Sequence, residues 1–242
     1  MKNLLFYFLF IFTFSLFSQE IKQDTTRIQN LEEVIVSSIR VKQNAPIAFT
    51  NVSKDELGKK NLGQDLPILL NSLTSVVTTS DAGAGVGYTG IRIRGINAQS
   101  TNITINGIPY NDAESLGTFW VDLPDFASSV ENLQLQRGVG TSTNGSSAFG
   151  ASINILTDLI SKTPYFENSN SIGSYNTTKN TFKFSTGILN DYFEFSGRLS
   201  MIGSDGYIDR SSSDLKSYFL QVNYKKENTL IKALSFGGHE IT

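Results

Sequence analysis

Three arginines are the residues of this chain best suited to specific charge chemistry. Arg92 and Arg94 alternate with isoleucines in Ile91-Arg-Ile-Arg-Gly95, and Arg137 ends the run that starts at Val130. A guanidinium group can hold a carboxylate through two parallel hydrogen bonds, which gives the contact both strength and direction. Because arginines are seldom buried without a partner, we expect all three to bind carboxylates on a neighbouring surface. The alternative is that they are solvated strand charges of little energetic value.

Residue types that support catalysis or metal binding are poorly grouped. The single histidine, His239, has no companion for a metal site and no nucleophile motif beside it. The glycines of 83–87 depart from the spacing of a dinucleotide-binding loop. Four acidic residues lack the ordered spacing of a calcium loop and predict a solvated acidic loop: Asp112, Glu114, Asp122 and Asp125. We therefore expect no catalytic residue, no metal and no cofactor.

The composition favours strands joined by turns. The chain of 242 residues has no cysteine, which excludes disulfides and thiolate metal sites. Its net charge of -2 gives no basic face for nucleic acid. Only 17% of the residues are charged, whereas glycine, phenylalanine and tyrosine are frequent, which is typical of β structure with many turns.

The first residues predict export from the cytoplasm. A short charged start precedes an almost wholly apolar run, Leu4–Phe17, that is too short for a comfortable transmembrane helix. This pattern indicates a signal peptide at residues 1–18, cut after Ser18; the alternative is an uncleaved membrane anchor. Residues 19–45 then predict a flexible polar leader, interrupted by one β-branched run.

Residues 46–158 predict an α+β domain of short helices and a small mixed sheet. Ser53 and Glu56 have the spacing of a helix capping box, and Asp65 is placed to cap a second short helix. Beyond these helices the pattern is one of short strands and glycine-rich turns, and it includes the strongest short-range hairpin signal of the chain, Asn106 and Gly107.

Residues 159–242 predict antiparallel strands that begin an outer-membrane β-barrel, after a linker at residues 161–168. Three runs alternate apolar and polar residues over about ten positions, the length of a tilted membrane-spanning strand: Thr181–Leu189, Tyr192–Met201 and Ser217–Lys225. The alternative is a soluble β-sandwich. An open sheet of about five such strands has unpaired edges, which lipid does not tolerate, so we expect this chain to be a fragment, truncated early in its barrel.

Ordered motifs between residues 91 and 155 resemble the plug domain of TonB-dependent outer-membrane receptors, as found in Bacteroidetes-like Gram-negative bacteria. The matching segments are Ile91–Gly95, Ile105–Pro109, Val130–Gly138 and Gly145–Ile155. Three polar residues depart from the family's usual "IERIEVLRG" strand: Asn132, Gln134 and Gln136. The likeness to the family therefore extends to fold and position more firmly than to the contacts of this strand.

The resemblance implies energy-driven uptake of a scarce small ligand, such as a siderophore, a vitamin or another nutrient, and no enzyme activity. Arg92, Arg94 and Arg137 would bridge the plug to the polar inner wall of its barrel. An apical loop would offer Tyr110, Phe119 and Trp120 to the ligand, unless these side chains only pack against the barrel. Two alternatives stay open: a passive barrel-anchored surface-binding protein or adhesin, and a secreted β-sandwich hydrolase.

A segment of the leader resembles the TonB box, which binds a TonB-type energy-transducing protein of the inner membrane. The segment consists of Glu33, Val34, Ile35, Val36, Ser37 and Ser38. An extended β-branched strand on a tether can add to the sheet edge of a partner through main-chain hydrogen bonds. The alternative is that this segment is the first strand of the plug.

Overall fold

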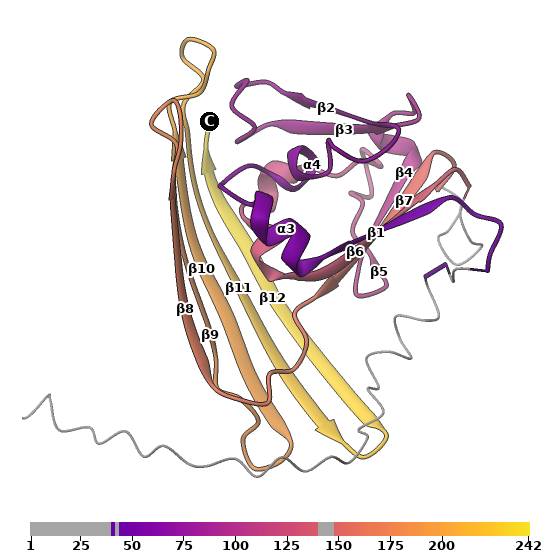
Figure 1. Ribbon diagram of the computed structural model, residues 1–242, viewed down its shortest axis with the longest axis vertical. Coiled ribbons are helices and arrows are strands. Elements are labelled where there is room, and N and C mark those ends of the chain that lie inside the picture. The colour runs from indigo at the N-terminus through magenta and orange to yellow at the C-terminus, as the bar shows by residue number, and fades with distance from the viewer. Residues whose placement is uncertain (1–39, 42–43, 140–147) are drawn as a thin grey trace, which may run out of the picture.

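The computed structural model describes residues 40–41, 44–139 and 148–242, so the predicted signal peptide and the TonB-box-like segment lie outside the described residues. Two parts are visible in Figure 1: an N-terminal domain of residues 44–158 and a tall, curved C-terminal sheet that lies along one side of it. None of the helices in the described ranges has the length and apolar character needed to cross a membrane.

A mixed sheet forms the centre of the N-terminal domain. Its order is β1-β6-β7-β4-β5, and the pair β4 and β7 is parallel while the other neighbours are antiparallel. The strands are β1 (Phe49–Ser53), β4 (Thr101–Ile105), β5 (Ile108–Pro109), β6 (Val130–Arg137) and β7 (Ala151–Thr157). Asn106 and Gly107 make the turn between β4 and β5 with φ of 51° and 85°. The predicted α+β class with a small mixed sheet is confirmed.

Short helices and a separate hairpin surround this sheet. They are α3 (Lys54–Lys60), α4 (Leu66–Leu69), the 3-10 helices η1 (Ala98–Ser100), η2 (Trp120–Asp122) and η3 (Phe126–Ser129), and the paired strands β2 (Val76–Ser80) and β3 (Thr89–Ile93). The capping box of α3 is present: Ser53 Oγ accepts from the Glu56 amide, and Glu56 accepts from the Ser53 amide. Asp65 precedes α4 but makes no capping bond, and its carboxyl group accepts instead from Thr89 Oγ1 at 2.9 Å.

The two faces of the mixed sheet differ in polarity. Leu133 and Leu135 of β6 point into the hydrophobic core, together with Ile153 and Ile155 of β7. Each such buried side chain contributes roughly 1.5–3 kcal/mol through the hydrophobic effect. On the opposite face of β6 the alternate residues are polar, and both Gln134 and Gln136 are buried there.

The C-terminal sheet consists of consecutive antiparallel strands. These are β8 (Tyr165–Ile172), β9 (Thr178–Ser185), β10 (Phe193–Ser204), β11 (Ser213–Lys226) and β12 (Thr229–Ile241). The sheet is open, with β8 and β12 as its edges, which confirms the predicted start of an unclosed barrel. The expected linker at residues 161–168 is wrong in its second half, because Tyr165 already begins β8.

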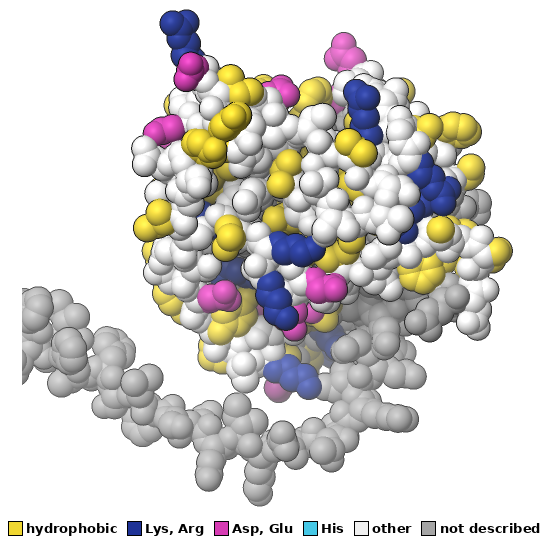
Figure 2. Space-filling model, turned by 45° about the horizontal axis from the view of Figure 1, so that its top comes forward, with side chains coloured by type: hydrophobic (Ala, Val, Ile, Leu, Met, Phe, Trp, Pro, Cys, Tyr) yellow, Lys and Arg dark blue, Asp and Glu magenta, His cyan; other side chains and the backbone are white. Residues whose placement is uncertain are grey.

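Each strand from β9 to β11 alternates between its two faces. Polar side chains such as Thr181 and Gln221 are buried on the face toward the N-terminal domain, whereas Phe182, Leu199 and Leu220 are exposed on the outer face. This is the polar-inside, apolar-outside pattern of an outer-membrane barrel wall. Figure 2 shows basic and acidic side chains interspersed on the surface of the molecule, with hydrophobic ones scattered among them.

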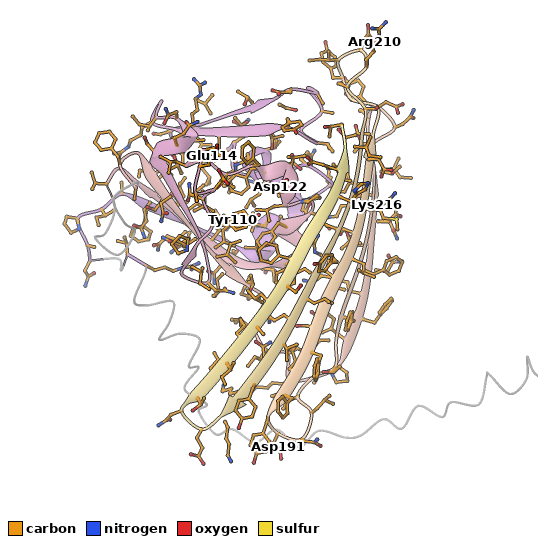
Figure 3. The ribbon with its side chains drawn as sticks, turned by 180° about the vertical axis from the view of Figure 1, so that it is seen from behind. Tyr110, Glu114, Asp122, Asp191, Arg210 and Lys216 are labelled. Carbon is orange, nitrogen blue, oxygen red and sulfur yellow. The ribbon has the colours of Figure 1, made fainter. Side chains whose placement is uncertain are left out.

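The connections of the sheet alternate between its two ends. Asp191 lies in the connection between β9 and β10, residues 186–192, and Arg210 lies in the connection between β10 and β11, residues 205–212. Figure 3 places these two residues at opposite ends of the sheet. The remaining connections, residues 173–177 and 227–228, are shorter, so each end has one shorter and one longer connection.

Candidate functional site at the interface of domain and sheet

A fully buried carboxylate of the N-terminal domain anchors the interface. The side chain of Asp125 is 0% exposed and forms ion pairs with Lys179 of β9 at 2.9 Å and Arg198 of β10 at 3.2 Å. It also accepts hydrogen bonds from Thr181 Oγ1 at 2.6 Å and from Ser200 Oγ. Burial by itself would raise the pKa of Asp125, but Arg198 and Lys179 hold that pKa well below its ordinary value.

Local backbone geometry aims this carboxylate at the sheet. Asp125 precedes η3 in the left-handed region, with φ of 52°, a conformation that aspartate tolerates better than most residues. Its main-chain carbonyl accepts from Arg198 Nη1 at 2.6 Å, and the Pro124 carbonyl accepts from the same nitrogen at 3.2 Å and from Ser217 Oγ at 2.8 Å. The loop before η3 therefore binds three strands of the wall, β9, β10 and β11.

A second carboxylate joins the end of β7 to the sheet. Asp158 pairs with Lys183 of β9 at 2.8 Å and with Lys54 of α3 at 2.7 Å. Its carbonyl accepts from Gln221 of β11 at 3.0 Å and from Lys232 of β12 at 3.2 Å. Burial raises the pKa of Asp158, and the two lysines outweigh this effect and lower it. Asp158 thus ties helix, mixed sheet and wall together.

Aromatic side chains form the apolar part of the interface. Phe126 of η3 lies 5.9 Å from Phe219 of β11 and 5.5 Å from Phe236 of β12, measured between ring centroids. Tyr110 also reaches Phe236, at 5.9 Å. Tilted and edge-to-face pairs of this kind contribute about 0.5–1.5 kcal/mol each beyond burial.

The three aromatic residues expected to contact a ligand differ in their exposure. Trp120 is 3% exposed and packs in the core of the N-terminal domain, so the expectation of a ligand contact is wrong for this side chain. Tyr110 is half-buried against the sheet, as the packing alternative requires. Phe119 alone is open to the surroundings, with 50% exposure. The sequence pattern could not separate them, because burial here depends on η2 and β12.

The three arginines make no ion pair among the described residues. Arg137 donates to the Thr74 carbonyl at 2.9 Å and to Thr50 Oγ1 at 2.8 Å, both within its own domain. Arg92 and Arg94 are exposed. Burial and the neighbouring Arg94 lower the pKa of Arg137, so these two cations lie close together. Their bridging to a barrel carboxylate stays a prediction, with no partner on β8 to β12.

Charge pairing across the described interface has the opposite sense to the one expected. The domain supplies the carboxylates, Asp125 and Asp158, and the sheet supplies the cations. Asp125 is therefore not part of a solvated acidic loop, and that expectation is corrected by its burial. A usable signal was present in the sequence: Lys179, Lys183 and Arg198 occupy positions of the strands whose neighbours along the same face are serine and threonine.

Two loops contact each other at the end of the interface near Arg210. The Ala82 carbonyl accepts from the Tyr207 amide at 2.8 Å, and the glycine loop of residues 81–90 thereby touches the loop between β10 and β11. Gly83 has φ of 71°, and a Cβ there would lie 3.0 Å from the Tyr207 side chain. Only glycine combines this conformation with such a close approach.

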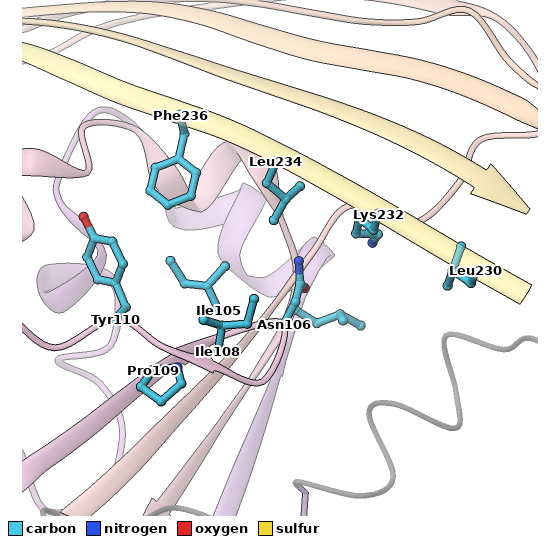
Figure 4. A pocket seen from close by; sticks show the side chains of 10 residues that line it. Ile105, Asn106, Ile108, Pro109, Tyr110, Leu230, Lys232, Leu234 and Phe236 are labelled. Atoms are coloured by element: carbon cyan, nitrogen blue, oxygen red, sulfur yellow. The ribbon is translucent and has the colours of Figure 1, made fainter.

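An apolar cavity of about 410 Å³ lies between the β4–β5 hairpin and β12. Figure 4 shows Ile105 and Ile108 from the hairpin opposite Leu234 and Phe236 from the strand, with Tyr110 at one end. Because β12 is an edge strand, one side of this cavity is formed by the edge of the sheet.

Comparison with known proteins identifies relatives of the N-terminal domain. Residues 41–152 match the family model described as TonB-dependent Receptor Plug Domain. A search of curated protein sequences gave no match.

Solved structures of receptors and a transporter share the fold of both parts. The siderophore receptor PirA from Acinetobacter baumannii superposes with a TM-score of 0.61 at 18% identity, over 87% of this chain and 33% of that one. The ferric yersiniabactin uptake receptor FyuA from Yersinia pestis gives 0.60 at 17% identity, over 80% and 31%. The copper transporter OprC gives 0.64 at 16%, over 79% and 31%. The chain thus spans about a third of the length of these proteins, and at these identities the likeness is one of fold.

Proposed function

We propose that the chain serves energy-coupled uptake of a small, scarce ligand, as a TonB-dependent receptor. The match of residues 41–152 to the TonB-dependent receptor plug domain supports this proposal. In this proposal the protein lies in the outer membrane, with β8 to β12 as barrel wall and the N-terminal domain as plug. The family-model match and the fold likeness to solved receptors support this arrangement. The plug blocks the barrel at rest, and a pull from the inner membrane moves or partly unfolds it.

The polar interface between plug and wall is the observation that carries this proposal. A permanent domain contact would gain most from a surface that is apolar throughout, whereas here Asp125 and Asp158 add ion pairs and hydrogen bonds beside the aromatic contacts of Phe126. Buried charge pairs are costly to form and contribute little net stability compared with apolar packing. Such contacts fix one geometry at rest and can exchange for contacts with water when the plug is pulled.

Energy coupling is assigned to the leader. The segment Glu33–Ser38 precedes the first described contact of the plug, Arg40, by a single residue. An extended strand that pairs with the sheet edge of a TonB-type partner resists a pull along its axis, because its main-chain bonds are loaded together.

The ligand is proposed as a siderophore, a vitamin or another small nutrient. The solved receptors of the same fold are described as siderophore, ferric yersiniabactin and copper proteins, which are small or metal-bearing cargoes. We propose no catalytic step, since the plug and wall residues described above hold the two parts together rather than surround a reacting group.

Proline substitution in the leader tests this function. In the receptor expressed in its outer membrane, Val34→Pro or Val36→Pro should abolish uptake and leave ligand binding at the cell surface unchanged, because proline removes a main-chain donor. Gln29→Pro, outside the segment, is the matched control. Unchanged uptake in Val34→Pro and Val36→Pro would remove the assignment of energy coupling to residues 33–38.

A further inference from the structure

The chain that enters the plug from the leader is held by a side-chain amide. The Val41 amide donates to Gln134 Oε1 at 2.9 Å, and Gln134 Nε2 donates back to the Val41 carbonyl at 3.1 Å. One donor and one acceptor of the same side chain thus satisfy the main chain of Val41, as a residue of a neighbouring strand would. Val41 is 5% exposed and Gln134 is 2% exposed, so water does not compete for these bonds.

Arg40 fastens the same point to two strands. Its Nη2 donates to the Asn132 carbonyl of β6 at 3.3 Å and to the Asn154 carbonyl of β7 at 3.1 Å. Burial lowers the pKa of Arg40 to about 10, which still leaves the guanidinium charged at neutral pH. Within the described ranges it forms no ion pair, so carbonyl dipoles are its partners.

Neighbouring amides fix the orientation of Gln134. Its Nε2 also donates to Asn51 Oδ1 at 2.9 Å, and its Oε1 also accepts from Gln136 Nε2 at 2.9 Å. A glutamate at this position could accept from the Val41 amide but could not donate to the Val41 carbonyl or to Asn51. The departure from the family's usual glutamate at 134 is therefore what allows the two-way bond to Val41.

We propose that Gln134 and Arg40 form a clasp that joins the leader to the central plug sheet and must open before a pull reaches β1. This rests on the proposed function, in which the pull begins at residues 33–38. The four hydrogen bonds of the clasp are the first described contacts that such a pull would load. Only residues 42–48 separate the clasp from β1, whose ladder with β6 starts at Phe49.

Opening of the clasp should release a defined length of chain. This opening frees the chain as far as Ala48, whose carbonyl accepts from the Arg137 amide of β6 at 2.9 Å. The chain from Val41 to Ala48 spans about 25 Å when extended. Pulling on the membrane-embedded receptor from a handle at residue 19 should therefore give a first rupture that releases less than this length, because the folded plug already spans part of it. This rupture should precede the unfolding of the plug sheet. Arg40→Ala and Gln134→Leu should remove or weaken that first rupture and leave the later ones in place.

Matched variants separate a clasp from a general loss of stability. Lys59→Ala, which removes an exposed cation of the same domain in the last turn of α3, should leave every rupture unchanged. Arg40→Ala alters only the leader side, so it remains informative even where Gln134→Leu fails to fold. A first rupture that is unchanged in Arg40→Ala would overturn the proposal, as would equal weakening of all ruptures.

Cysteine labelling gives a second readout. The chain contains no cysteine, so a Val41→Cys receptor can be labelled at one place in this chain with a maleimide. Adding Arg40→Ala should accelerate labelling about tenfold, the effect of losing about 1.4 kcal/mol of hydrogen bonding; an unchanged rate contradicts the clasp. Both measurements need no TonB-type partner, so their failure is distinguishable from a failure of the proline test of the proposed function.

Discussion

Replacing Asp125 by asparagine tests how the plug is held against the barrel wall. The change keeps the size of the side chain but removes the charge that Lys179 and Arg198 neutralise at 2.9 and 3.2 Å. The three side chains are at most 3% exposed, so both cations would stay buried without a counter-charge. Removing one partner of a buried ion pair costs about 3–5 kcal/mol, and we expect the plug to lose stability by about this amount.

Native-state hydrogen exchange of the receptor in detergent measures this loss where it occurs. A cost of 3–5 kcal/mol corresponds to a fall of roughly two to four orders of magnitude in the protection of amides that exchange through opening of the plug, such as those of η3 and β6. Asp112→Asn is the matched control, because Asp112 is an exposed member of the same acidic group. Adding Lys179→Met to Asp125→Asn should restore part of the protection. A change below about tenfold at Asp125→Asn would refute the reasoning.

Three further predictions concern the plug. Burial raises the pKa of Asp65 to about 8, so the folded plug retains a proton that the unfolded chain releases; this contribution to stability is full below about pH 4 and is lost as the pH rises toward 8. Asp65→Asn should flatten this decline, measured as the difference between the free energies of unfolding in urea at pH 5 and pH 8. An equal difference in the variant and the unsubstituted protein would contradict the prediction. Trp120→Ala should lower the free energy of unfolding by about 3–5 kcal/mol, whereas a surface ligand contact would alter binding alone. Gly83→Ala should loosen the contact with Tyr207 and expose that loop to protease, without unfolding the mixed sheet; unchanged cleavage would argue against strain at this glycine.

Local patterns predicted the elements whose structure depends on a few adjacent residues. The capping box of Ser53 and Glu56 and the alternation of β9 to β11 follow from near-neighbour geometry, and they occur as expected. The strand β8 was not predicted, because its exposed polar residues do not alternate with apolar ones. Its place in the sheet comes from pairing with β9.

The interface could be predicted much less well. Asp125 has the composition of a solvated loop, and only the approach of β9 and β10 makes it a buried ion-pair partner. Trp120 likewise lies in a loop-like stretch and is buried by the fold around it. Gln134 and Gln136 depart from the apolar residues expected in a buried strand. Both are buried on the polar face of this sheet, and no local sequence pattern reveals that this face is polar and buried.

Cross-linking of the leader to a TonB-type partner tests energy coupling most directly. Because the chain has no cysteine, single cysteines at positions 33 to 38 can be cross-linked in cells to cysteines on the edge strand of the partner's periplasmic domain. Strand pairing predicts cross-links at alternate positions, including Val34 and Val36, and none at Gln23 in the polar leader. Equal or absent cross-linking at all of these positions would contradict the assignment of this chain to energy-coupled uptake through residues 33–38.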